Sequence, residues 1–205
     1  MSEYTVREEL KPSGLAGISD AQIDDHWGLY KGYVTQTNAL RKELADLRSA
    51  SQGASMAYAD RRRRFGFELN GMVLHEYYFG NMKAGGALDP NGEFARLAQA
   101  EFGGLDEWKA DLTNAGKTRG IGWAITYFDP ATGGINNHFI QLHEDGNVAG
   151  FAPLVVLDVF EHAYILDYKA AGRPAYIESF LKNLNGVAID ARVAAAKAGK
   201  IAARF

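Results

Sequence analysis

Cysteine is absent from this chain of 205 residues. Its absence excludes disulfides, thiolate metal sites and cysteine nucleophiles, so any bound metal must be held by imidazole and carboxylate groups. The sequence also lacks any run close to the roughly 20 apolar residues of a membrane-spanning helix. Residues 1–20 carry early acidic side chains and no apolar core. We therefore expect no membrane partner and a cytoplasmic location.

An excess of basic residues is missing as well. The formal net charge is -3, which argues against a nucleic-acid partner, because nucleic-acid binders normally carry a basic excess or a long basic stripe. The short run Arg61–Arg64 is better explained as the solvated beginning of a helix than as a polyanion site. A small anionic substrate would have to be drawn by local charge rather than by net charge.

Hydrophobic residues make up 47% of the chain, which allows a sizeable core. The apolar periodicity predicts a long amphipathic helix over residues 19–50 and a second helix over 57–82, packed antiparallel. The segment KAGGALDPNG at 83–92 gathers Gly-Gly, Asp-Pro and Asn-Gly and is typical of a linker. We place the domain boundary inside it, so that residues 1–88 form an α-hairpin domain and 89–205 an α/β domain.

The second half of the chain mixes short helices with short strands. Two short helices are predicted at EFARLAQAEFG and LDEWKADLTNAGKT, and the segments after them predict three strands. The predicted strands are 122–128, 136–143 and 151–159. Helices are predicted at 161–172, at 174–185 and in the Ala-rich tail 187–204. The expected fold is therefore α+β, an N-terminal antiparallel α-hairpin followed by an α/β domain with a small three-stranded antiparallel sheet.

The segment LDVFEHAYILDY at 157–168 is the first pointer to chemistry. It places Asp158, Glu161 and His162 in a run that is otherwise apolar and aromatic. Burying a carboxylate costs several kcal/mol unless a cation or hydrogen-bond donors compensate it. A bound metal ion would provide that compensation.

Two of the five histidines lie where buried ligands would be expected. His26 shares a face of the first helix with Tyr30 and Tyr33, near its apolar stripe. His75 lies among apolar residues, and Gly71 one turn earlier lets another segment approach closely. Histidines on neighbouring antiparallel helices can meet, as they do in the metal sites of helical bundles.

Asp158 and His162 would supply a third and a fourth ligand from the end of a strand and the turn after it. A set of three His and one Asp suits iron, manganese or zinc. His143 ends a predicted strand, and we expect it beside the site, whereas His138 has no expected role. The motif HEYYF is not the zinc-protease motif, because the second His that this motif requires is absent.

The segments that contain these residues resemble the iron/manganese superoxide dismutase family over nearly the whole chain. DVFEHAY is similar to the family's D-V-W-E-H-A-Y signature, and GIGWAI to its G-S-G-W strand. ISDAQIDDHWGLYKGYVTQTN and LHEYYFGNM resemble its first and second ligand segments, and GRPAYIESFLKNLN resembles its R-P-x-Y-I helix.

The resemblance implies a superoxide dismutase, an enzyme that converts superoxide into dioxygen and hydrogen peroxide. It implies four ligands to one iron or manganese ion per subunit: His26, His75, Asp158 and His162. Tyr33 takes the place of the family's gateway tyrosine, Trp123 lines the metal pocket, and His143 lies where many members have a Gln bound to the solvent on the metal.

The resemblance also implies how the chain meets its partners. Glu161 matches a Glu that reaches the ligand His of the other subunit, so Glu161 and His162 imply a homodimer, with a tetramer left open. Arg173 is a candidate for drawing in superoxide, with a plain structural ion pair as the alternative. We expect Gly71 to leave room for His143.

Several positions depart from the family pattern. Phe160 replaces a Trp, Ile165 replaces a second Tyr, Gly186 stands where a Trp is usual, and the block from His26 to Tyr33 is one residue short. The choice between iron and manganese stays open. Two alternatives remain, a zinc-dependent hydrolase with the same ligands and a catalytically silent metal-binding relative; for the hydrolase, Glu76 would project from another face of its helix.

Overall fold

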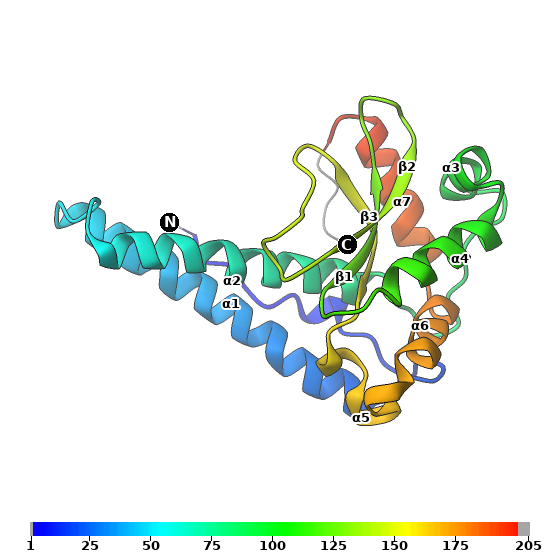
Figure 1. The fold of residues 1–205 in the computed structure, drawn as a ribbon, viewed down its shortest axis with the longest axis horizontal. Coiled ribbons are helices and arrows are strands. Elements are labelled where there is room, and N and C mark those ends of the chain that lie inside the picture. The colour runs from blue at the N-terminus through cyan, green and yellow to red at the C-terminus, as the bar shows by residue number, and fades with distance from the viewer. Residues whose placement is uncertain (1, 201–205) are drawn as a thin grey trace.

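The computed structural model describes residues 2–200 of the chain. It has the expected α+β fold, a long helical hairpin followed by a three-stranded sheet with helices around it (Figure 1). A continuous hydrophobic core joins the base of the hairpin to the sheet and its helices.

The hairpin consists of α1 (Asp20–Ser49) and α2 (Met56–Gly80). Each helix begins after a serine whose side chain accepts a backbone N–H of the first turn, Ser19 for α1 and Ser55 for α2. Such caps satisfy N–H groups that have no partner inside the helix. Both predicted helices are confirmed, and Figure 1 shows their connected ends projecting from the rest of the molecule.

The sheet contains β1 (Trp123–Phe128), β2 (Ile135–Ile140) and β3 (Ala152–Asp158). Both pairings are antiparallel and β1 is central, in the order β2-β1-β3. Trp123 pairs with Asp158, so the beginning of β1 and the end of β3 lie side by side. The second strand is shorter than predicted and ends before His143, because the chain turns at Leu142 with a φ of 48°.

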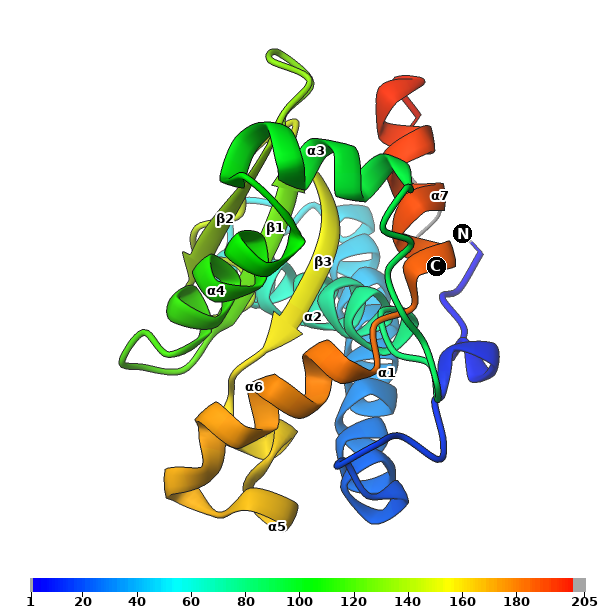
Figure 2. The same ribbon diagram turned by 90° about the vertical axis from the view of Figure 1, so that its right-hand side faces the viewer.

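Helices cover both faces of the sheet. Those after the hairpin are α3 (Glu93–Phe102), α4 (Leu105–Gly116), α6 (Arg173–Lys182) and α7 (Gly186–Lys197). In Figure 2, α3 and α4 lie in front of the sheet and α2 lies behind it. The hairpin thereby meets the sheet directly, through contacts between α2 and β3.

The helix predicted over 161–172 is wrong as a continuous element. The structure has a 3-10 helix at Glu161–Ala163, the short α5 (Ile165–Tyr168) and a second 3-10 helix at Ala170–Gly172. The breaks fall at Tyr164 and at Lys169, whose φ is 58°. Because of these two breaks, the segment consists of three short helical turns and not of one straight helix.

The Ala-rich tail is helical as α7, and residues 201–204 of that prediction lie outside the described part. Within residues 2–200, none of the helices has the length and hydropathy that crossing a membrane requires.

Candidate metal centre

Four side chains from distant parts of the sequence meet at the base of the hairpin. One ligand atom from each lies within 4.8 Å of all the others. His26 comes from α1, His75 from α2, Asp158 from the last residue of β3, and His162 from the 3-10 helix that follows.

The Asp158 carboxylate is the centre of the cluster. Its Oδ2 lies 3.2 Å from Nε2 of His26, 3.7 Å from Nε2 of His75 and 3.1 Å from Nε2 of His162. His26, His75 and Asp158 are completely buried, and the His162 side chain is 23% exposed. Three imidazole nitrogens therefore converge on one carboxylate oxygen in the interior.

Hydrogen bonds outside the cluster orient two of the four side chains. Nδ1 of His75 lies 2.6 Å from the Gly71 carbonyl, so it carries the proton and leaves the lone pair of Nε2 facing the cluster. The Phe160 backbone N–H donates to Oδ1 of Asp158 at 2.8 Å, which leaves Oδ2 for the histidines. Partners of this kind fix ring orientation and raise ligand basicity in metal sites.

Gln22 holds the segment that carries His162, a role that the sequence analysis missed. Its side-chain amide donates to the His162 carbonyl at 2.7 Å and accepts from the Leu166 backbone N–H at 3.1 Å. Gln22 is buried on α1, four residues before His26. The sequence does contain a signal for this role, because Gln22 is a polar residue on the same helix face as the candidate ligand His26.

The electrostatics favour the ligand forms of three of the four side chains, neutral His26 and His75 and ionised Asp158, but favour the protonated form of His162. Burial lowers the pKa of His26 and lowers the pKa of His75 well below its ordinary value. Burial alone would raise the pKa of Asp158, but His162 and His26 more than offset it and hold the pKa below the usual range. Burial opposes protonation of His162 too, but Asp158 raises its pKa overall.

The donor set fits a metal ion. Nε2 of His26 and Nε2 of His75 are buried and make no hydrogen bond within the described structure. Buried polar atoms without partners are costly, and a cation at the centre of the cluster would satisfy both lone pairs. Three nitrogens and one carboxylate oxygen suit iron, manganese or zinc.

His143 lies beside this cluster, linked to Trp123 and Tyr33. The Trp123 indole N–H donates to Nδ1 of His143 at 3.1 Å, and the Tyr33 hydroxyl lies 2.7 Å from Nε2. Burial lowers the pKa of His143 to about 4 and raises the pKa of Tyr33 to about 12. The short block between His26 and Tyr33 therefore does not remove Tyr33 from the site.

Gly71 accommodates Tyr33, and the expectation that it would leave room for His143 is wrong. A Cβ atom at Gly71 would lie 2.6 Å from Cδ1 of the Tyr33 ring. The two hairpin helices approach closely at this point, so the ring across the interface takes the space. His143 meets the hydroxyl at the far end of the same ring.

Two phenylalanines enclose His143. The ring centroid of Phe67 lies 4.5 Å and that of Phe160 lies 5.0 Å from the His143 centroid. Phe160, one of the departures from the family pattern, also stacks on His162 at 5.2 Å. Phe67 was missed, although it lies four residues before Gly71 on one face of α2.

Among the described residues Arg173 forms no ion pair, and its role in drawing in superoxide stays a prediction. Its guanidinium donates to the carbonyls of Thr118 at 2.9 Å and Gly120 at 2.6 Å, and it lies over the Tyr164 ring. It shares a surface hollow with Glu161, whose side chain is exposed. The structure thus shows Arg173 holding the loop that leads into β1.

Three other positions named from the sequence, Gly186, His138 and Ile165, have the following surroundings. A Cβ at Gly186 would lie 2.3 Å from the Ala87 carbonyl oxygen, so a large side chain has no room there. His138 lies on β2 outside the cluster and contacts Asn136. The Ile165 side chain is 46% exposed on α5.

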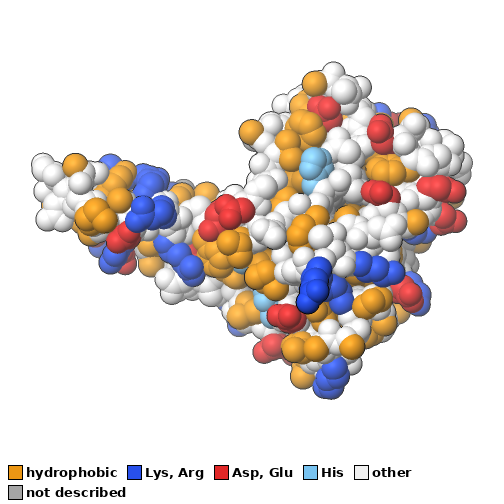
Figure 3. Space-filling view, viewed as in Figure 1, with side chains coloured by type: hydrophobic (Ala, Val, Ile, Leu, Met, Phe, Trp, Pro, Cys, Tyr) orange, Lys and Arg blue, Asp and Glu red, His pale blue; other side chains and the backbone are white. Residues whose placement is uncertain are grey.

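The basic run is part of the solvated hairpin. Arg61 pairs with Glu43, Arg63 with Asp60, and Arg64 with Glu68. Figure 3 shows basic and acidic side chains intermixed along this projection.

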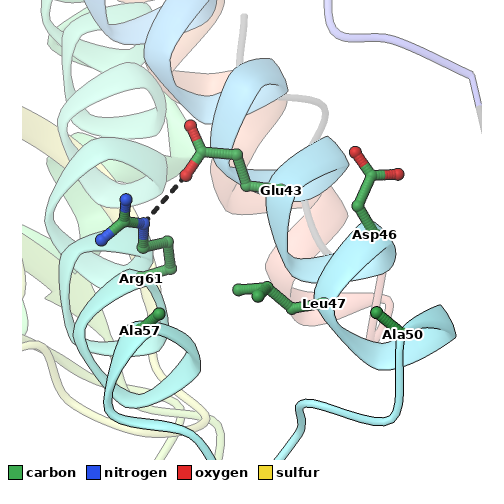
Figure 4. Close-up of a pocket in the computed structure, with 6 residues that line it drawn as sticks. All are labelled: Glu43, Asp46, Leu47, Ala50, Ala57 and Arg61. Atoms are coloured by element: carbon green, nitrogen blue, oxygen red, sulfur yellow. Dashed lines mark hydrogen bonds and ion pairs between the residues drawn. The ribbon is translucent and has the colours of Figure 1, made fainter.

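The hollow in Figure 4 lies between the ends of α1 and α2, with the Glu43–Arg61 pair at one side. Along α1, Glu43 is about 25 Å from His26 at 1.5 Å per residue. The hollow is therefore separate from the metal cluster.

Comparison with known proteins places this chain in a family. The family model described as iron/manganese superoxide dismutases, C-terminal domain, matches residues 90–192. A protein of Aquifex aeolicus named superoxide dismutase [Fe] is 37% identical over 194 residues, which cover 91% of this chain and 89% of that protein.

Two further relatives carry similar names. A superoxide dismutase [Fe] of Cupriavidus metallidurans is 33% identical over 92% of this chain and 97% of its own length. A superoxide dismutase [Mn] of Haloferax volcanii is 31% identical over 75% of each chain. The chain therefore belongs to the iron/manganese superoxide dismutase family.

Proposed function

We propose that the protein converts superoxide into dioxygen and hydrogen peroxide at a single iron or manganese ion. Four residues would hold the ion: His26, His75, Asp158 and His162. The observation that carries this proposal is the convergence of their ligand atoms within 4.8 Å in the interior. Bound there, the ion would supply reversible one-electron chemistry, by which one superoxide is oxidised to dioxygen and a second, with two protons, is reduced to hydrogen peroxide. Zinc has no such redox chemistry.

The residues around the ligands support this chemistry in separate ways. Asp158 contributes a negative charge that would balance part of the charge of the ion. The Trp123 indole is completely buried, with its ring 5.1 Å from that of His75, so we expect it to form a wall of the site and to keep water out. The rings of Tyr33 and His143 lie beside the ligand His75, with centroid distances of 5.0 and 5.8 Å, and we propose that these two residues handle protons there.

The two alternatives have less support. A zinc-dependent hydrolase would need a carboxylate free to act on a bound water, but Glu76 accepts a hydrogen bond from the Tyr30 hydroxyl at 3.1 Å inside the hairpin. A catalytically silent relative would be expected to lose some of the donor set, whereas all four donors are present.

Reconstitution of the apoprotein with iron, manganese and zinc separately tests the proposal. We expect superoxide consumption with iron or manganese and none with zinc, at equal metal content by elemental analysis. Stoichiometric binding of all three metals without activity from any of them would contradict it.

We further propose that the protein works as a homodimer in which Glu161 of each subunit contacts His162 of the other. Both side chains reach the surface, and exposed Ile165 and Leu166 follow them on α5. Sedimentation equilibrium should show a dimer for the native protein and a weakened one for Glu161→Ala. A Glu161→Ala dimer of native affinity would rule out this contact. The domain boundary at residue 88, a tetramer and the cytoplasmic location stay predictions.

A further inference from the structure

A helical turn is open between the 3-10 helix Glu161–Ala163 and α5. In a continuous α-helix, the backbone N–H of Leu166 would donate to the backbone carbonyl of His162, four residues earlier. The two elements are instead separated at Tyr164, whose backbone has a φ of -146° and a ψ of -11°. The Leu166 N–H and the His162 carbonyl therefore need other partners.

The side-chain amide of Gln22 provides both partners. Its Nε2 donates to the His162 carbonyl at 2.7 Å, and its Oε1 accepts from the Leu166 N–H at 3.1 Å. A glutamine amide combines a donor and an acceptor in one group, as a peptide unit does. The Gln22 amide, in a residue that is only 1% exposed, is thus inserted between the two ends of a missing helical hydrogen bond.

The open turn separates the directions of two side chains. In a closed α-helical turn, residues four apart lie on the same face of the helix. Here Nε2 of His162 lies 3.1 Å from Oδ2 of Asp158 in the cluster, whereas Leu166 is 46% exposed on α5. A closed turn would bring His162 and Leu166 to one face.

We infer that Gln22 is a positioning residue for His162. Its amide replaces the helical hydrogen bond between Leu166 and His162, and the turn that it holds open directs the His162 ring toward the other ligands. The hydrogen bonds of Gln22 do not depend on the proposed function, but their effect on metal binding rests on the proposed role of His162 as a ligand.

The first turn of α1 also holds α5 where this insertion requires it. The Asp167 carboxylate accepts from the Ser19 backbone N–H at 2.8 Å and from the Ser19 hydroxyl at 2.7 Å. The same hydroxyl oxygen caps α1 by accepting the Gln22 backbone N–H at 3.0 Å. Figure 1 shows α5 beside the beginning of α1. Ser19 and Gln22 therefore bind neighbouring residues of α5.

Removal of the amide should let the turn close. Two backbone groups in a partly buried place would lose their partners, and unpaired buried groups are costly. They can pair with each other if the φ of Tyr164 changes from -146° toward the helical value of about -63°. We therefore expect a variant without the amide to form the helical bond and to move His162 away from the cluster.

NMR couplings across hydrogen bonds test the arrangement directly in isotope-labelled, zinc-loaded protein. In the native protein we expect a coupling between the backbone nitrogen of Leu166 and the side-chain amide carbon of Gln22. We expect none between the Leu166 nitrogen and the His162 carbonyl carbon. A native protein with the reverse pattern would overturn the inference, and this measurement needs no variant.

Gln22→Met removes the amide but keeps the length of the side chain. In this variant we expect a coupling between the Leu166 nitrogen and the His162 carbonyl carbon. We also expect the affinity for manganese to fall about tenfold, because a group that orients a ligand is lost. Titration of the metal-free protein with manganese measures the affinity.

Thr37→Val is the matched control. Thr37 is also a buried polar residue of α1, and its Oγ1 makes no hydrogen bond within the described structure. It lies about 22 Å from Gln22 along the helix at 1.5 Å per residue. This variant should keep both the native couplings and the native affinity for manganese.

Two results from the variants would count against the inference. One is a Gln22→Met protein in which Leu166 does not pair with His162, since other contacts would then hold the turn open. The other is a Gln22→Met protein that binds manganese as tightly as Thr37→Val. None of these measurements requires turnover, so an inactive protein with the expected couplings and affinities would contradict the proposed function alone.

Discussion

At the scale of single residues, Asp158 explains why ionisable groups occur in an apolar stretch. Its Oδ2 faces three histidines, while its backbone carbonyl accepts from the Tyr176 hydroxyl and its Oδ1 accepts a backbone N–H. Each oxygen of this buried residue has a partner, so the cost of burial is compensated atom by atom. The sequence indicates the need for compensation, but only the fold shows which atoms provide it.

Replacement of one proposed ligand should separate metal binding from folding. We expect His162→Ala to lower the affinity for manganese or iron by about 100-fold or more and to abolish activity, because one of four donors is lost. His138→Ala is the matched control and should leave both nearly unchanged, since His138 lies on β2 outside the cluster. Metal titration and superoxide consumption measure the two effects, and equal losses would refute the ligand assignment.

Metal retention should depend on pH through His162. Asp158 raises the pKa of this imidazole in the metal-free protein despite its partial burial, so protons compete with the metal as the pH falls. Because the ligand form is neutral, binding should be strong above the raised pKa and should weaken steadily below it, beginning near or above the ordinary value of about 6.5. Dialysis across a pH series followed by elemental analysis checks this, and metal content that stays constant down to pH 5 would contradict it.

At the scale of elements, the hairpin carries two ligands and depends on one close contact between its helices. The Tyr33 ring of α1 occupies the space over Gly71 of α2. We expect Gly71→Ala to lower the free energy of unfolding by about 1–3 kcal/mol, because the new methyl group overlaps a packed ring. The displaced ring should also lose its hydrogen bond to His143 and reduce activity.

Gly28→Ala on α1 is the control for helix propensity. A Cβ at Gly28 meets nothing within 4 Å, so this change should stabilise the protein by about 0.5–1 kcal/mol. Urea unfolding measures both free energies. A Gly71→Ala protein that is as stable and as active as Gly28→Ala would show that the contact with Tyr33 is unimportant.

Apolar periodicity predicts the long helices correctly, but it fails for the segment after β3 that carries part of the site. The two hairpin helices follow from apolar spacing and serine caps, which are local properties of the chain. The segment after β3 has a helical pattern too, yet it breaks at Tyr164 and Lys169. Its path is set by contacts with α1 through Gln22, and no local pattern reports such tertiary contacts.

The residues next to the ligands show the same limit. His143 could be placed beside the site from the sequence, but its neighbours Phe67 and Asn147 could not. They come from different elements and meet only after α2 and the sheet have packed. The sequence therefore gives the chemical types at the site more reliably than the contacts that orient them.

At the scale of the whole molecule, the candidate centre joins the two halves of the chain. His26 and His75 belong to the hairpin, whereas Asp158 and His162 follow the sheet. An ion bound by all four would link the halves at a point where the described structure has buried nitrogens without hydrogen-bond partners. Because such an ion would bind only to the folded state, its binding must stabilise the whole fold.

Metal removal should consequently lower the melting temperature. With free metal at about 100 times its dissociation constant, binding contributes about 2.7 kcal/mol, which corresponds to a change of about 5–10 °C for a chain of this size. Calorimetry of metal-free and manganese-loaded protein measures the shift, and readdition of manganese should restore it. The melting temperature of the His162→Ala variant should change little with added manganese, because the variant lacks the fourth donor and binds the metal about 100-fold or more weakly. If the melting temperature of the native protein is the same with and without the metal, the ion does not link the hairpin to the sheet.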